Sequence, residues 1–133
     1  MKRKTNAFFI ILSLILVLIS CIGAHLIQTD FGHVTITDVR IPMPSGETLR
    51  VLVHRPDTAT VDNPAPCVIT SHGYHATLET QDITSIELAR RGFVVFNMDT
   101  YSAGSSSGTS IPYNDSRSYY GLGMLQLVDY VHD

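Results

Sequence analysis

One stretch of this 133-residue chain resembles a nucleophile motif. Gly104-Ser105-Ser106-Ser107-Gly108 matches Gly-x-Ser-x-Gly, a pattern in which the central serine attacks a carbonyl carbon. The pattern requires a strand that leads directly into it and a helix that follows directly. Here the preceding apolar run ends near Asp99, and Thr109 to Pro112 cannot begin a helix at once. We therefore interpret Ser106 as a loop residue and expect no nucleophile in this chain.

The partners that a serine nucleophile needs are also poorly placed. A triad of this type runs in the order Ser, Asp or Glu, His, and only Asp115, Asp129, His132 and Asp133 follow Ser106 as candidates. Asp129 and His132 are three residues apart on one predicted helix, so both project from a single element. A solvated helix end accounts for them better than a triad does.

A second stretch, Ser71-His72-Gly73-Tyr74, follows the short apolar run Cys67-Val68-Ile69-Thr70. Such a run is typical of a strand buried on both faces. We interpret His72 as a residue that stiffens the turn after this strand, not as a general base.

The elements around these stretches predict a three-layer α/β domain. Alternating apolar residues over 34–41 and 49–53, with a turn at Ser45-Gly46, predict an antiparallel hairpin with one buried face. After the hairpin we expect, in order, the strand at 67–70, a helix that begins near Thr77 and ends before Gly92, a strand at 93–98 and a helix after Asp115 or Ser116. The expected apolar face of the first helix is Ile83, Ile86, Leu88 and Ala89, and that of the second is Leu122, Leu125, Leu127, Val128 and Val131. We expect the sheet to become parallel after the hairpin and the strand at 93–98 to form its open edge.

The order of these parts resembles the N-terminal half of an α/β-hydrolase, of the esterase, dienelactone-hydrolase-like or serine-peptidase branches. The resemblance covers about 33–133 and rests on VITSHGYHATLETQDITSIELARRGFVVFNMDTYSAGSSSG. It implies that the backbone N–H of Tyr74 forms part of an oxyanion hole, with Gly73 allowing the sharp turn and His72 supporting it. A tight turn without chemistry is the alternative. Complete folds of this family usually exceed about 200 residues, so we expect an N-terminal fragment that stops before the nucleophile.

The N-terminal segment predicts a membrane anchor over residues 1–29, followed by the α/β domain over 30–133. Ala7 to Ile27 is long enough and apolar enough to contact membrane lipid as a spanning helix. Lys2, Arg3 and Lys4 precede it, so the positive-inside rule places the N-terminus in the cytoplasm and the domain outside. A lipoprotein signal with Cys21 as the modified residue, or a cleaved secretory signal, remains an alternative.

The composition excludes several classes of partner. After residue 4 the chain has six arginines, no lysine and twelve acidic residues, which argues against nucleic acid. Cys21 and Cys67 cannot form a disulfide framework, and no Cys/His cluster has zinc spacing, so we expect neither metal nor cofactor.

The predicted function is that of a membrane-anchored serine hydrolase that acts on ester or small amide bonds. This chain is expected to be the part that carries the oxyanion-hole loop and lacks the triad. The intact parent would take a small-molecule acyl substrate. The alternatives are a catalytically inert, membrane-tethered fragment and an extracytoplasmic binding module. The binding module would use the tyrosines of one rim, which are Tyr101, Tyr113, Tyr119 and Tyr120.

Overall fold

The computed structural model describes residues 2–44, 46–73, 75–108 and 121–132. The helices in this part of the chain are α1 (Lys2–Gln28), η1 (Asp30–Gly32), η2 (Leu78–Gln81), α2 (Asp82–Arg90) and α3 (Gly121–His132). The strands are β1 (Val34–Pro42), β2 (Thr48–Pro56), β3 (Cys67–Ser71) and β4 (Val94–Met98).

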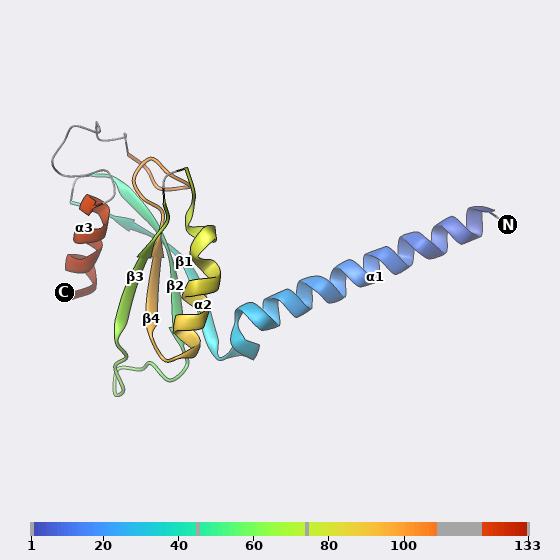
Figure 1. Cartoon of the computed structure of the whole chain (residues 1–133), viewed down its shortest axis with the longest axis horizontal. Coiled ribbons are helices and arrows are strands. Elements are labelled where there is room, and N and C mark those ends of the chain that lie inside the picture. Colours follow the sequence, from blue (N-terminus) through green and yellow to red (C-terminus); the bar gives the residue numbers. More distant parts are fainter. Residues whose placement is uncertain (1, 45, 74, 109–120, 133) are drawn as a thin grey trace.

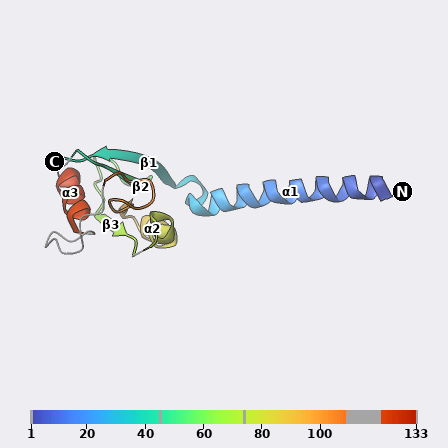
Figure 2. The same ribbon diagram turned by 90° about the horizontal axis from the view of Figure 1, so that it is seen from above.

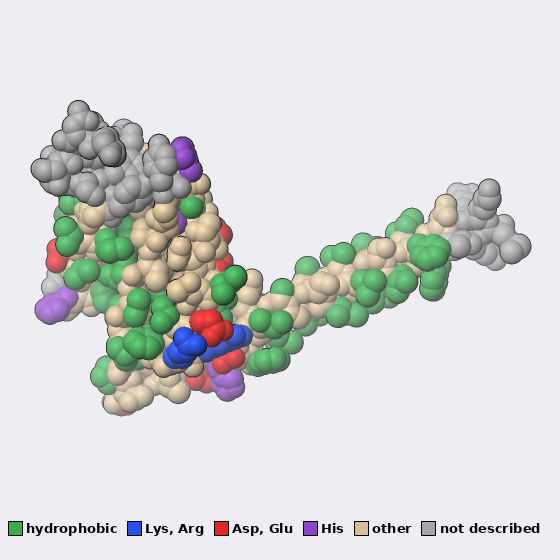
Figure 3. All heavy atoms as spheres, in the orientation of Figure 1, with side chains coloured by type: hydrophobic (Ala, Val, Ile, Leu, Met, Phe, Trp, Pro, Cys, Tyr) green, Lys and Arg blue, Asp and Glu red, His purple; other side chains and the backbone are tan. Residues whose placement is uncertain are grey.

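Helix α1 extends away from the rest of the chain as a single rod (Figure 1). Its segment Asn6–Gln28 is long and apolar enough to cross a membrane, and it is the one such helix among the described residues. A signal sequence has the same length and composition. Its apolar side chains remain exposed along the rod (Figure 3), so no part of the domain covers them.

The four strands form one mixed sheet in the order β1-β2-β4-β3. Strands β1 and β2 pair antiparallel as the predicted hairpin, and β2 pairs antiparallel with β4. Strands β3 and β4 pair parallel, with Cys67 opposite Val94 and Ser71 opposite Met98. The expected change from an antiparallel hairpin to parallel strands is therefore present.

The position of the open edge was predicted wrongly. Strand β4 lies inside the sheet, between β2 and β3, and the two edge strands are β1 and β3. The reason is that the connection from β3 through α2 returns the chain on the hairpin side of β3. As an edge strand β3 is also only half-buried, with Cys67 exposed, so the expectation of burial on both faces was wrong as well.

Helices α2 and α3 cover opposite faces of the sheet, as Figure 2 shows. Two neighbouring residues of β4 make this clear, because successive side chains of a strand point to opposite faces. Asn97 reaches the start of α2, where its Nδ2 lies 3.3 Å from Asp82 Oδ1. Met98 belongs to the main apolar cluster, in which it packs with Leu49, Val51 and Leu127 of α3. The result is the predicted three-layer arrangement.

The hairpin contributes to both layers, contrary to the expectation of a single buried face. In β1 the alternation changes phase, so that Val34 and Ile41 are both buried although they are an odd number of positions apart. Ile41 joins the cluster beneath α3, and Val34 lies beside the end of α2 at Ala89.

The segment before α2 starts differently from the prediction. Thr77 has an extended backbone and its side chain caps no backbone N–H; its hydroxyl instead donates to a carboxylate oxygen of Glu79. The 3-10 turn η2 precedes α2 and buries Leu78 completely. Because Leu78 fills the space under the first turn, the buried face of α2 is Ser85, Ile86 and Ala89. Ile83, predicted on that face, is 80% exposed.

Helix α3 presents Gly123 and Leu127 to the sheet, and Leu122 and Val131 are partly buried against the same cluster. Leu125 and Val128, predicted on the apolar face, are exposed instead: Leu127 points at the sheet, and residues one or two positions away from it project in other directions. The predicted caps Asp115 and Ser116 lie outside the described residues.

Candidate functional site

The carboxyl ends of β3 and β4 lie side by side, because the two strands are parallel and Ser71 is opposite Met98. The turn at His72 and Gly73 therefore meets the loop that begins at Asp99. Reactive groups of open α/β sheets are found at this edge. The structure thus brings together the two stretches that the sequence analysis singled out.

His72 is buried and joins the two loops through both ring nitrogens. Its Nδ1 lies 2.8 Å from the carbonyl oxygen of Gly73, and its Nε2 lies 3.1 Å from the backbone nitrogen of Thr100. A carbonyl can only accept and a backbone N–H can only donate, so the proton is on Nδ1 and Nε2 is the acceptor. This neutral tautomer has no free lone pair for a substrate proton, and the side chain holds the turn after β3 against the loop after β4.

Gly73 is exposed, and among the described residues none would lie within 4 Å of a β-carbon at this position. Its φ does not lie in the left-handed region, so the turn itself does not require glycine. Tyr74, the residue whose N–H the resemblance assigns to the oxyanion hole, lies outside the described residues.

Asp99 organises the loop after β4 from a fully buried position. Its Oδ1 accepts the backbone N–H of Leu78 at 2.9 Å, and its Oδ2 accepts the backbone N–H of Ser105 at 3.0 Å. The Arg50 guanidinium lies 3.6 Å from Oδ2. Three segments far apart in sequence are thus fixed by one carboxylate, which satisfies the rule that a buried charge is paired and hydrogen-bonded.

Ser106 is held within the same loop by its side chain. Its Oγ donates to the carbonyl oxygen of Asp99 at 2.9 Å and accepts the backbone N–H of Arg50 at 2.8 Å. Ser107 continues this contact, with its N–H donating to Thr48 O at 2.9 Å and its Oγ accepting the Thr48 N–H at 2.7 Å. The Gly/Ser loop therefore runs along the start of β2, and β4 ends at Met98, well before it.

Arg50 links the polar face of β2 to this rim and was not singled out from the sequence. Its guanidinium contacts Asp38 at 3.0 Å and Glu79 at 2.8 Å. Hydrogen bonds to these two carboxylates raise the pKa of Arg50 above its usual value. Hydrogen bonds from Thr77 and then from Arg50 lower the pKa of Glu79 to about 2. The only sequence signal was an arginine among the apolar residues of a predicted strand.

Other predicted residues are not brought to the rim. Tyr101, proposed for a tyrosine-bearing rim, is 1% exposed, and its hydroxyl bonds Gln126 of α3. Tyr113, Tyr119 and Tyr120 lie outside the described residues. Asp129 and His132 lie on α3, as predicted, and no group of three or more His, Cys, Asp or Glu side chains among the described residues could hold a metal ion.

Comparison with known proteins gives matches among solved structures alone. No family model and no curated protein matches the chain. A hypothetical protein from Pseudomonas aeruginosa matches with a TM-score of 0.62 and 24% identity, over 74% of this chain and 30% of that one. An esterase from Pyrococcus furiosus matches with a TM-score of 0.58 and 20% identity, over 75% and 35%. An epoxide hydrolase from Vigna radiata matches with a TM-score of 0.58 and 14% identity, over 74% and 29%.

The chain has a mixed α/β fold that matches part of the α/β-hydrolase fold. The matched region spans about a third of the length of these structures. At these identities the likeness concerns the fold, and the chemistry has to be argued from the residues of this chain.

In this α/β-hydrolase-like fold an apolar groove of about 450 Å³ runs between the edge strand β3 and α3. It is lined by Cys67, Ile69, Met124, Val128, Val131 and His132. Cys67 is exposed as a residue, but partial desolvation by the groove raises the pKa of its thiol, so this side chain remains neutral at neutral pH. Among the described residues no strand pairs with the outer side of β3, and the groove lies next to this side.

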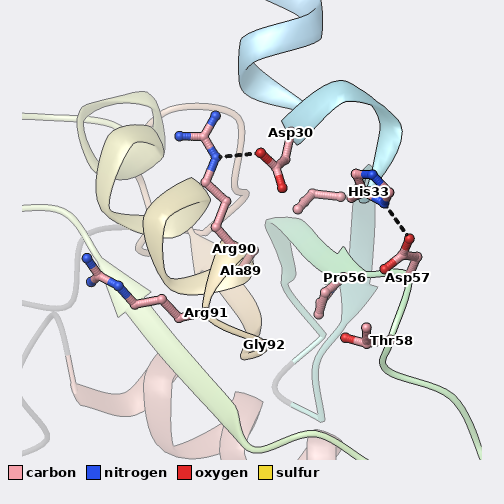
Figure 4. A pocket seen from close by; sticks show the side chains of 10 residues that line it. Asp30, His33, Pro56, Asp57, Thr58, Ala89, Arg90, Arg91 and Gly92 are labelled. Carbon is pink, nitrogen blue, oxygen red and sulfur yellow. Dashed lines mark hydrogen bonds and ion pairs between the residues drawn. The ribbon is translucent and has the colours of Figure 1, made fainter.

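A second pocket, of about 380 Å³, lies at the other end of the sheet, where α1 meets the domain (Figure 4). Its charged groups are paired with one another: Arg90 Nε lies 3.2 Å from Asp30 Oδ1, and His33 Nδ1 lies 2.7 Å from Asp57 Oδ2. The hydrogen bond that His33 donates to Asp57 raises the pKa of His33. Because these charges balance, the pocket does not favour a free anion or cation.

Proposed function

We propose that this chain forms the oxyanion-hole part of a membrane-anchored serine hydrolase that acts on ester or small amide bonds. The observation that supports this is the bridge made by His72 between Gly73 and Thr100. It fixes the turn after β3, where an amide that follows Gly73 can be held in place. A preorganised N–H of this kind stabilises negative charge that develops in the transition state.

In the proposed reaction a serine attacks the acyl carbon, and the carbonyl oxygen becomes an oxyanion held by the N–H of Tyr74. Collapse of this intermediate expels the alcohol or amine, and water then releases the acid. His72 contributes as a positioning residue, since its Nε2 lone pair is already used by Thr100. The acyl group is proposed to enter beside Gly73, where none of the described residues would meet a β-carbon within 4 Å.

The nucleophile of this reaction is proposed to come from a part of the parent protein outside this chain. Both bonds of the Ser106 hydroxyl are made within the loop and to β2, which leaves it no general base among the described residues. The chain by itself is accordingly proposed to be inert as a hydrolase.

Membrane anchoring is the second half of the proposal. Helix α1 would span the bilayer with Lys2, Arg3 and Lys4 in the cytoplasm and the domain outside. A topology reporter fused after Asp133 should be active only outside the cytoplasm, and activity inside would contradict this orientation. A shortened product acylated at Cys21 would instead support the lipoprotein alternative.

The catalytic proposal is tested with a serine-directed phosphonate and p-nitrophenyl acetate. The chain alone should show no turnover and no labelling, and a longer protein that contains it should show both. In that protein, Tyr74→Pro removes the amide hydrogen and should lower kcat by about 10²–10³-fold. The matched control Tyr74→Phe keeps the amide and should retain activity. Equal activity of the two variants would refute the role of this N–H, and labelling of the chain alone would make Ser106 the first residue to test.

A further inference from the structure

Arg90, at the C-terminal end of α2, connects the domain to the end of α1. Arg90 Nη2 donates to the carbonyl oxygen of Ile27 at 2.6 Å, and Arg90 Nε lies 3.2 Å from Asp30. The last carbonyls of a helix lack partners within the helix and are stabilised by cations. Arg90 therefore caps α1 from 63 residues away in the sequence.

This contact determines how far the domain lies from a membrane that α1 crosses. The apolar segment Asn6–Gln28 has 23 residues. At about 1.5 Å per residue it measures about 35 Å, slightly more than a hydrocarbon core of about 30 Å. Ile27 therefore lies at the boundary between acyl chains and headgroups. A guanidinium 2.6 Å from its carbonyl lies at the same depth, and Arg91 follows directly.

The residues at this depth have side chains suited to an interface. Phe31 is 70% exposed, and its backbone is left-handed with φ 57°, a conformation that costs about 1 kcal/mol or more for a residue other than glycine. Nothing in the domain covers this aromatic ring. The Arg91 side chain is 68% exposed, and its ion pair with Glu87 is long, at 3.7 Å.

We propose that the junction face, made of Phe31, Arg90 and Arg91, docks on the phospholipid headgroups of the leaflet that α1 enters. Phe31 inserts below the headgroups and Arg91 binds their phosphates, while Arg90 keeps the domain against the end of α1. The domain thus contacts the membrane surface and does not change its orientation freely about the end of α1. This inference rests on the anchoring proposed above.

The charges around the junction face indicate which lipids it suits. Arg90 and Arg91 are matched by Asp30 and Glu87, and His33 is paired with Asp57. Figure 3 shows side chains of both signs gathered where α1 meets the domain. A balanced set of charges fits zwitterionic headgroups and gains little from anionic lipid.

The test uses the full chain in phosphatidylcholine vesicles and tryptophan reporters, because the chain contains no tryptophan. Leu14→Trp reports on α1, Phe31→Trp, which keeps an aromatic ring, on the junction face, and Val61→Trp, at a residue 99% exposed, on a distant loop. Acyl-chain quenchers should quench Leu14→Trp, and a headgroup nitroxide should quench Phe31→Trp at least threefold more than Val61→Trp. Quenching at Phe31→Trp should be unchanged when a quarter of the lipid is anionic.

Two further variants test the arginine contacts of the junction face. In the Phe31→Trp background, Arg91→Gln and Arg90→Gln should each reduce headgroup quenching at least twofold, and the matched Val61→Ser should not. The Arg91 side chain is 68% exposed, so its replacement leaves the packing of the domain intact.

The outcomes separate this proposal from the anchoring on which it rests. If Leu14→Trp is quenched and Phe31→Trp is not, the anchor stands and the docking is refuted. If Leu14→Trp is not quenched, the anchoring fails and the docking fails with it. Quenching of Phe31→Trp that appears only with anionic lipid would overturn the assignment to zwitterionic headgroups.

Discussion

The carboxylate of Asp99 occupies the space that a β-carbon on Gly104 would need: the two would be 2.1 Å apart at Asp99 Oδ2. Gly104 also has a left-handed backbone with φ 53°. The loop after β4 can therefore close over Asp99 only with glycine at this position, and closure is what lets the Ser105 N–H reach the carboxylate.

Gly104→Ala should destabilise the domain strongly. Asp99 is fully buried and cannot move without giving up its bonds to the N–H groups of Leu78 and Ser105, so we expect a loss of about 3 kcal/mol or more. Gly46→Ala is the matched control, since Gly46 has φ 86° but open space around it, and it should cost about 1 kcal/mol. Urea unfolding of the full chain in detergent measures both, and equal losses would show that the contact with Asp99 is unimportant.

Ser106→Ala should affect stability and not catalysis. It removes two partly buried hydrogen bonds, to Asp99 O and from Arg50 N, and should cost about 2 kcal/mol. Ser105→Ala changes an exposed side chain and should cost little. In a full-length relative with hydrolase activity, kcat should remain nearly intact. A loss approaching that of a triad knockout, about 10⁶-fold, would establish Ser106 as the nucleophile.

The Glu79 carboxylate should make part of the stability dependent on acid pH. Its pKa is lowered from 4.5 to about 2 in the folded chain, so the folded state favours the ionised form. This contribution is complete above about pH 4.5 and is lost as the pH falls towards 2. Glu79→Gln should therefore be less stable than the parent at pH 7, and the difference should shrink over that interval. Thr77→Val removes the hydrogen bond that lowers the pKa of Glu79 most, so it should narrow the pH interval over which this stability is lost. A stability difference between Glu79→Gln and the parent that does not depend on pH would contradict the assignment.

The unpaired side of β3 should make the chain prone to self-association. An edge strand exposes N–H and C=O groups that can pair with another chain, and here an apolar groove lies next to it. Cys67→Arg places a charge at this edge and should slow aggregation, measured by light scattering of residues 30–133. Val61→Arg adds the same charge on an exposed loop and should have no such effect. A sharp unfolding transition of this segment above about 50 °C would contradict its expected instability.

The sequence by itself determined the features that depend on local interactions. The long apolar run before Asp30 predicted α1, and alternation and apolar runs predicted all four strands and their order along the chain. The ordered motifs from 68 to 108 indicated the α/β-hydrolase fold. Each of these elements depends on the burial or the backbone preference of about ten neighbouring residues. The spacing of apolar residues in the sequence indicates such local preferences directly.

Only the tertiary structure decided which segments lie next to one another. The crossover through α2 places β4 inside the sheet and leaves β3 at the edge, the reverse of what we predicted. Likewise, Asp99 joins Leu78 to Ser105, and Arg90 caps α1 at Ile27. A hydrogen bond between residues dozens of positions apart leaves no periodic trace in the sequence, because its partners are selected by the path of the whole chain and not by their neighbours.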